Sequence, residues 1–167
     1  MTGHEDLAAP SAWVERWAAL VPQGRVLDLA CGGGRHSRLF LSRGYEVLAV
    51  DREPLGVAGV RCVRADLEDG SPWPLPGERF QGIVVTNYLH RPLFALIEQA
   101  LAPGGVLIYE TFMQGNERFG KPSNPAFLLR PGELWRAFGG LQVVAFEQGR
   151  ARAPKPAMIQ RLCAIRG

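Results

Sequence analysis

The sequence predicts an α/β domain with a doubly wound, seven-stranded sheet that is mostly parallel and has an antiparallel last strand. Seven short apolar runs recur along the 167 residues, each bounded by glycine, proline or charged residues. Segments with helical spacing lie between several of these runs, and such alternation favours a parallel sheet covered on both faces. Only residues 148–157, with two prolines and no helical period, separate the last two runs. A crossover between parallel strands needs more chain, so the final strand is expected to run antiparallel to the sixth.

The predicted strands follow in chain order. They are Arg25–Ala30, Tyr45–Val50, Val60–Ala65, Gln81–Asn87, Val106–Phe112, Leu141–Glu147 and Met158–Ile165. The first of them are almost wholly apolar, as expected for strands that are buried on both faces.

Four segments have the apolar spacing or the end signals of helices. They are Ala12–Leu20, Gly34–Arg43, Pro92–Leu101 and Pro131–Phe138. Ser11 is a suitable N-cap for the first, and Gly44 is a suitable stop for the second.

Composition excludes several classes of protein. Apolar residues make up 47% of the chain, and 20 glycines and 13 prolines indicate many tight turns without low complexity. These values exclude a disordered chain, a collagen and a coiled coil. No apolar run approaches the ~18 residues of a membrane span, and residues 1–10 do not resemble a signal peptide. We therefore expect one soluble, cytoplasmic domain.

The charge is unevenly distributed. Residues 1–70 hold ten acidic and eight basic side chains, whereas residues 71–167 hold six acidic and eleven basic ones. The last twenty residues contain five basic side chains and no acidic one: Arg150, Arg152, Lys155, Arg161 and Arg166. This pattern is open to two interpretations, solvated arginines or a patch that attracts anions.

The three cysteines, Cys31, Cys62 and Cys163, do not indicate a metal or redox site. They are far apart, odd in number and without C-x-x-C or Cys/His spacing. Because each lies in or beside an apolar run, we expect buried free thiols.

The clearest functional signal is a glycine-rich turn between the first strand and the following helix. Residues 26–36 read VLDLACGGGRH. Glycines at such a turn let the backbone bend sharply and let a ligand approach the main chain. Asp51 ends the next strand, where a carboxylate can accept hydrogen bonds from both hydroxyls of a ribose. Together, the turn and Asp51 indicate a nucleoside-binding site.

The turn differs from one that binds a dinucleotide. The pattern G-x-G-x-x-G would need a third glycine where this chain has Ser37. Asp28 precedes the glycines, and its carboxylate would repel a pyrophosphate but suits a ligand with an amino group or positive charge.

These motifs resemble those of the class I S-adenosylmethionine (SAM)-dependent methyltransferases, and the resemblance extends over nearly the whole chain. Residues 28–34 match the first motif of the family, D-x-x-x-G-x-G. The resemblance implies that the glycines pass under the methionine part of the cofactor and that Asp28 acts on its amino group. Asp51 matches the acid that binds the ribose. Residues 65–67 match the third-strand motif, where Asp66 takes the adenine amino group and the next backbone N–H meets the ring.

The cofactor-binding residues expected from this resemblance are Asp28, Ala30, Cys31, Gly32, Gly34, Asp51, Arg52, Asp66, Leu67 and Asn87. The implied organisation is a single methyltransferase domain over residues 1–167, with an N-terminal helix and lid (1–22) and a Rossmann-like core (23–167). Residues 109–112, the long loop that follows and the small size are similar to tellurite-resistance-type and related small-molecule methyltransferases.

One connection departs from the family pattern. Only residues 52–59 join the second and third predicted strands, and two of these eight residues are glycines. Because a crossover usually needs about a dozen residues, either the connection is unusually tight or residues are absent from the chain.

The substrate is expected at the carboxyl end of the fourth strand, where residues 86–90 read TNYLH. The predicted catalytic residues are His90, Tyr88 and Glu110. His90 is either a general base, since its ordinary pKa lies near 6.5, or a cap of the following helix. Tyr88 would pack over the cofactor, and Glu110 would either face the site or pair with an arginine. Transfer from a sulfonium is an in-line displacement that requires neither a metal nor a covalent nucleophile.

Two loops and one helix are candidates for covering the site. The seventeen residues 113–129 exceed the usual connection and favour a lid. Arg150, Arg152 and Lys155 are expected near the substrate entrance. Trp13 and Trp17 either pack in the core or cover the entrance.

The function expected from these features is methyl transfer from SAM to a small-molecule acceptor with anionic character. The alternatives are a nucleic-acid methyltransferase and a SAM- or nucleotide-binding module without catalysis. The basic C-terminal end favours nucleic acid, but few aromatic residues interleave with its arginines, so a nucleic-acid partner is not expected. A dinucleotide-dependent oxidoreductase is disfavoured by Asp28 and the missing third glycine.

Overall fold

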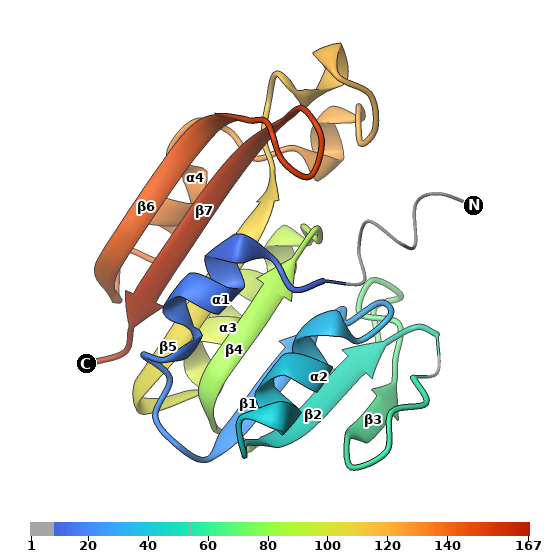
Figure 1. Cartoon of the computed structure of the whole chain (residues 1–167), viewed down its shortest axis with the longest axis vertical. Coiled ribbons are helices and arrows are strands. Elements are labelled where there is room, and N and C mark those ends of the chain that lie inside the picture. Colours follow the sequence, from blue (N-terminus) through green and yellow to red (C-terminus); the bar gives the residue numbers. More distant parts are fainter. Residues whose placement is uncertain (1–8, 54) are drawn as a thin grey trace.

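The computed structural model of the protein describes residues 9–53 and 55–167, which form a seven-stranded sheet with helices on both faces (Figure 1). The strands are β1 (Arg25–Leu29), β2 (Glu46–Asp51), β3 (Arg61–Arg64), β4 (Phe80–Thr86), β5 (Leu101–Phe112), β6 (Gln142–Ala151) and β7 (Ala157–Ile165). Their order across the sheet is β3-β2-β1-β4-β5-β7-β6. β1 to β5 pair in parallel, and β7 runs antiparallel to both β5 and β6. The predicted fold class and the antiparallel last strand are confirmed.

The sheet divides the core into two clusters, because alternate residues of a strand point to opposite faces. On one face α1 (Ala12–Ala18) and α2 (Arg35–Ser42) pack over a cluster that includes Val26 and Val84. On the other face α3 (Phe94–Ala100) and α4 (Glu133–Ala137) pack over a cluster that includes Leu27 and Ile83. Figure 1 shows α1 and α2 in front of the sheet and α3 and α4 behind it.

Helix α1 is held by a cap and by its tryptophans. Ser11 Oγ accepts hydrogen bonds from the N–H groups of Trp13 and Val14, which confirms the predicted N-cap. Trp13 is buried, donates from Nε1 to the carbonyl of Leu162, and makes an edge contact with Trp17. The core-packing interpretation of the two tryptophans is confirmed.

Three local predictions need correction. β5 begins at Leu101, so Pro103-Gly104-Gly105 lies within the strand, at a shift of its register against β4. The helix expected from Pro92 begins with a 3₁₀ turn (Arg91–Leu93), and α4 is shorter than expected. Cys62 is exposed rather than buried because β3 is an edge strand, whereas Cys31 and Cys163 are buried as expected.

The connection between β2 and β3 is tight. The strands pair in parallel from Leu48–Arg61 to Asp51–Arg64, and the described residues between them form no helix. The two strands therefore pair in parallel although no crossover helix joins them. A nearby segment without helix or strand, residues 65–79, contributes Leu75 and Trp73 to the core beside it.

Within residues 9–53 and 55–167, no helix has the length and apolar character that crossing a membrane requires.

Candidate active site

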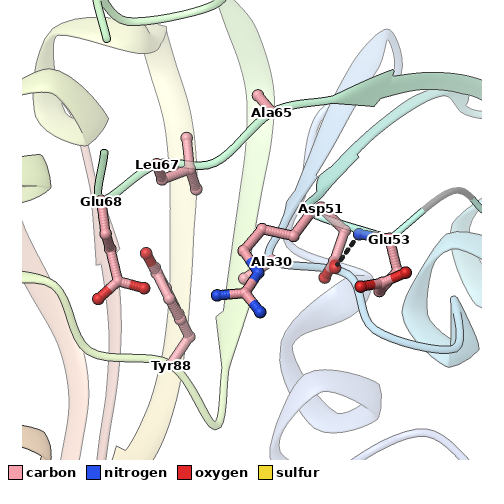
Figure 2. A pocket seen from close by; sticks show the side chains of 8 residues that line it. Ala30, Asp51, Glu53, Ala65, Leu67, Glu68 and Tyr88 are labelled. Carbon is pink, nitrogen blue, oxygen red and sulfur yellow. Dashed lines mark hydrogen bonds between the residues drawn. The ribbon is translucent and has the colours of Figure 1, made fainter. Parts of the chain in front are cut away.

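A first cavity of about 300 Å³ lies at the carboxyl ends of β1 to β4 (Figure 2). Its lining residues come from the turns after these strands. They are Ala30, Asp51, Arg52, Glu53, Ala65, Leu67, Glu68 and Tyr88. Five of them, Ala30, Asp51, Arg52, Leu67 and Tyr88, are among the predicted site residues.

The backbone of the glycine-rich turn is open to a ligand bound at the carboxyl ends of the parallel strands. Ala30 and Gly32 both have left-handed backbones, with φ of 55° and 54°. A Cβ added to Gly32 or Gly33 would meet no atom within 4 Å. A ligand can therefore approach this main chain closely, which is the physical reason for glycine there.

Asp51 ties the second strand to this turn. Its Oδ2 accepts a hydrogen bond from the N–H of Gly32 (2.9 Å), and its Oδ1 accepts one from the N–H of Glu53 (3.0 Å; dashed in Figure 2). A carboxylate oxygen accepts more than one hydrogen bond, so Asp51 keeps capacity for ligand hydroxyls.

Asp28 lies beneath the turn and is fully buried. Ser37 Oγ donates to its Oδ2 at 2.7 Å, and burial raises its pKa from 3.8 to about 7. A buried carboxyl of this kind would gain from a nearby positive charge, because the charge would restore its ionised form. The position of Asp28 thus suits a cationic ligand group at the turn.

Tyr88 lines the first cavity, and Asp66 lies between two of its lining residues. Asp66 Oδ1 accepts a hydrogen bond from the N–H of Glu68, and its neighbours Ala65 and Leu67 line the cavity whereas Asp66 does not. The hydroxyl of Tyr88 is buried without a hydrogen-bond partner among the described residues. Burial and the nearby carboxylates, Glu68 first, raise the pKa of Tyr88. Figure 2 shows its ring extending toward Glu68.

A second cavity of about 280 Å³ lies beyond the ends of β4, β5 and β7. Its walls are the segment before α1, the start of α2 and the turn between β6 and β7. The lining residues are Ala9, Pro10, Ser11, Ala12, Arg35, Asn87, Glu110, Phe112, Ala153, Pro154, Lys155, Ala157, Ile159 and Arg161.

Glu110 is buried in the wall of this second cavity. Its Oε2 accepts a hydrogen bond from Arg161 Nε at 2.5 Å, and its Oε1 accepts one from Ser11 Oγ at 2.9 Å. Of the two predicted alternatives, pairing with an arginine is confirmed, although Glu110 also lines the cavity.

His36 connects the second cavity to the glycine-rich turn. Its Nε2 accepts the N–H of Ser11 (3.0 Å), and its Nδ1 lies 3.4 Å from Thr86 Oγ1. Burial, with the nearby charge of Arg35, lowers the pKa of His36 from 6.5 to about 3. A neutral imidazole that accepts at Nε2 carries its proton on Nδ1, so His36 donates toward Thr86. The sequence did not predict Ser11, His36 and Arg35 as site residues. The only signal for them in the sequence is that they lie close to the glycine-rich turn or to the start of a helix.

A third cavity, also about 280 Å³, joins the other two. It shares Glu68 and Tyr88 with the first and Asn87 and Phe112 with the second. Asn87 has a left-handed backbone (φ 53°), and its N–H donates to the carbonyl of Glu110. Asn87, a predicted cofactor-binding residue, lines the second and third cavities and not the first.

His90 lies just outside these cavities. Its Nδ1 is 3.7 Å from Glu68 Oε1, and its side chain makes no capping hydrogen bond to the 3₁₀ turn that follows. His90 nevertheless holds the N-cap position of this turn, as the capping alternative predicted, and its carbonyl accepts the N–H of Leu93.

The predicted lid, residues 113–129, contributes Pro122 and Phe127 to the third cavity. It contains two 3₁₀ turns, and Asn116 Oδ1 accepts the N–H of Met158 on β7. The basic C-terminal residues separate: Lys155 and Arg161 line the second cavity, whereas Arg166 donates to main-chain carbonyls of residues 98–101.

Cys31, Gly32, Gly34 and Asp66 complete the predicted set without lining the first cavity. They lie in the turn or next to lining residues. No group of three or more His, Cys, Asp or Glu side chains suited to a metal ion is found in the described ranges.

The chain thus combines a seven-stranded α/β sheet with a cavity at the carboxyl edge of its parallel strands. Residues 27–109, about half of the chain, match a family model described as a methyltransferase domain. The chain belongs to this methyltransferase domain family.

Several solved structures share this fold at low sequence identity. TehB from Haemophilus influenzae is 16% identical, with a TM-score of 0.74 over 93% of this chain. The chain spans 61% of TehB. A 1,6-didemethyltoxoflavin-N1-methyltransferase from Burkholderia thailandensis, with bound 1,6-didemethyltoxoflavin and S-adenosylhomocysteine, is 21% identical (TM-score 0.71, 98% of this chain, 80% of that one). A SAM-dependent methyltransferase from Mesorhizobium loti is 20% identical (TM-score 0.68, 93% and 99%). No curated protein sequence matches the chain.

The residues present fit SAM, the methyl donor of this family. The open backbone at Gly32 and Gly33 leaves room for the methionine part. Asp51 stands at the cavity with acceptor capacity for ribose hydroxyls, and Asp28 lies where an amino group would restore its charge.

Proposed function

We propose that this protein transfers the methyl group of SAM to a small, anionic acceptor bound in the second and third cavities. The observation that carries the proposal is the meeting of the cavities at Asn87 and Tyr88, directly after β4. A cofactor in the first cavity would face an acceptor across these two residues. Two cavities of about 280 Å³ each suit a small molecule better than a nucleic acid.

The chain's own residues bind and orient the reactants. When SAM is bound, Asp51 would accept hydrogen bonds from the ribose, the N–H of Leu67 would meet the adenine ring, and Asp28 would hold the amino group. SAM supplies an electrophilic sulfonium methyl when it is bound. The protein holds the acceptor atom on the axis of that methyl and excludes water.

The three predicted catalytic residues take different roles. Tyr88 forms the wall between the first and third cavities. Glu110 acts as a positioning residue, because its carboxylate is already engaged by Arg161 and Ser11. His90 is the candidate base for an acceptor that carries a proton at neutral pH. Since His90 lies outside the cavities, it would act through Glu68, which lines the third cavity and lies 3.7 Å from His90 Nδ1.

Cofactor binding is tested by isothermal titration of SAM, S-adenosylhomocysteine and NAD into the protein. We expect the first two to bind and NAD to show no heat. Asp51→Ala should weaken SAM binding by about tenfold or more, since it removes charged hydrogen-bond acceptors. Glu46→Ala is the matched control, because Glu46 is an exposed carboxylate at the opposite end of the same strand. Tight NAD binding without SAM binding would contradict the proposal.

The role of His90 is tested by pH–rate profiles once an acceptor has been found by screening small anions. If His90 is the base, we expect the wild type to lose activity on acidification, and His90→Gln to lose this dependence. Identical profiles would reject His90 as the base.

A further inference from the structure

The second cavity combines an apolar wall with cations on its rim. Eight of its lining residues are apolar, among them Ala12, Phe112 and Ile159. Three are cations and one is a carboxylate. The lining therefore carries an excess of two positive charges before any ligand enters.

These cations are not equivalent. Arg161 is paired with Glu110, whose other oxygen is held by Ser11, so this pair is internally neutralised. The contacts of Glu110 with Ser11 and Arg161 join the segment before α1 to β5 and β7. Arg161 is thus a structural element of the wall, and its charge is not free for a ligand.

Arg35 is the first unneutralised cation. Nη1 donates to the carbonyl of Ala9 at 3.1 Å, and no ion pair to Arg35 occurs within residues 9–53 and 55–167. About half of this residue is buried, and burial lowers the pKa of its guanidinium, an effect that Glu110 and Asp28 oppose. A partly desolvated guanidinium has unused donors and favours a planar, bidentate anion.

Lys155 is the second cation of the lining without an ion pair among the described residues. It lies in the β6–β7 turn, on a different wall from Arg35, and pairs with no carboxylate of the described chain. Two cations on separate walls of one cavity can engage the same anionic group. The apolar residues between them would contact the remainder of the ligand.

We propose that Arg35 and Lys155 form an anion subsite that binds the carboxylate of an amphipathic acceptor, with its apolar body against Phe112 and Ile159. This inference rests on the proposed function, since it identifies the class of acceptor. A compact inorganic oxyanion would leave the apolar wall exposed to water. A neutral molecule would leave the partly desolvated guanidinium of Arg35 without an anionic partner.

The test measures binding, not turnover. With S-adenosylhomocysteine present, a panel of aryl and alkyl carboxylates, including phenylacetate, is titrated and followed by calorimetry and ligand-observed NMR. Phenylacetamide, phenethylamine and inorganic phosphate are the comparison ligands. We expect a carboxylate to bind at least about tenfold more tightly than its amide, because each ionic hydrogen bond contributes roughly that factor.

Matched variants connect the binding to the subsite. Lys155→Gln and Arg35→Gln should each weaken carboxylate binding about tenfold, while Arg35→Lys restores part of it. Arg152→Gln, an exposed cation of the same turn that does not line the cavity, is the control for Lys155. Arg43→Gln, exposed just after the end of α2, is the control for Arg35.

Each other outcome overturns the inference. Equal affinities for the acid and its amide would refute the anion subsite. Phosphate binding as tight as that of the best carboxylate would refute the role of the apolar wall. No carboxylate binding, with SAM still bound, refutes the subsite alone. If SAM does not bind to the wild type, the proposed function itself is refuted.

Discussion

Asp28 and His36 are two buried titratable residues on either side of the glycine-rich turn, and burial perturbs both in the direction of the neutral form. Asp28 holds Ser37, and His36 holds Ser11. His36 Nε2 can accept its hydrogen bond only while the imidazole is neutral, whereas Asp28 Oδ2 can accept from Ser37 in either protonation state.

Asp28 makes the stability of the free protein depend on pH. Its pKa is about 7 in the folded state and 3.8 in the unfolded state, so the folded state binds the proton more tightly. Its contribution is present below the unfolded pKa and is lost as pH rises from about 4 to about 7. Asp28→Asn should flatten this fall in the free energy of unfolding, measured by urea denaturation across that range. It should also weaken SAM binding. A pH dependence identical to the wild type would contradict the raised pKa.

His36 acts in the opposite direction. Its pKa of about 3 lies below the unfolded value of 6.5, so its contribution is present above 6.5 and is lost as pH falls toward 3. His36→Gln should reduce the loss of stability on acidification, measured by the same denaturation at pH 4 to 7. A steeper acid loss in the variant would show that the imidazole is not buried in its neutral form.

At the scale of elements, the N-terminus of α1 and the glycine-rich turn place the walls of two cavities. The Ser11 hydroxyl caps α1 and also donates to Glu110 on β5. Gly34 begins α2 with φ of 81°, and a Cβ there would lie 2.9 Å from Leu55 Cδ1. The turn is thus packed against the tight β2–β3 connection.

Loss of the Ser11 hydroxyl should destabilise the protein. Ser11→Ala removes an N-cap, which usually costs about 1 kcal/mol, and leaves a buried carboxylate oxygen without its donor. We expect a loss of about 2 kcal/mol in urea denaturation. Ser42→Ala, which removes an exposed hydroxyl bonded to the carbonyl of Leu39, is the control and should change little. Equal effects of the two variants would contradict the role of Ser11.

Gly34→Ala should cost more than Gly44→Ala. Both glycines have left-handed backbones, with φ of 81° and 87°, and each alanine loses about 1 kcal/mol or more for that reason. Only at Gly34 does the new Cβ meet Leu55, whereas at Gly44 it meets nothing within 4 Å. Leu55→Ala in the Gly34→Ala background should remove the excess cost in denaturation. An excess that persists there would show that Leu55 is not its source.

At the scale of the molecule, the sheet brings distant residues to one edge. The carboxyl ends of β1, β2 and β4 place Ala30, Asp51 and Tyr88 around one cavity, and β5 and β7 bring Glu110 to Arg161. Because a ligand that binds only the folded state stabilises it, SAM at about one hundred times its dissociation constant should raise the melting temperature by roughly 5–10 °C. An equal rise with NAD would contradict a specific SAM site.

The sequence by itself determined the strands, the reversed last strand and the glycine-rich turn with Asp51, because apolar runs, glycines and short connections are local signals. The exposure of Cys62 and the start of β5 were mispredicted, since both depend on neighbours in the sheet. Only the tertiary structure decided which charges remain free. Ser11, Glu110 and Arg161 are distant in the chain and meet only when β5, β7 and α1 pack together. That packing neutralises Arg161 and leaves Arg35 and Lys155 at the cavity, because an ion pair depends on distance in space and not on position in the sequence.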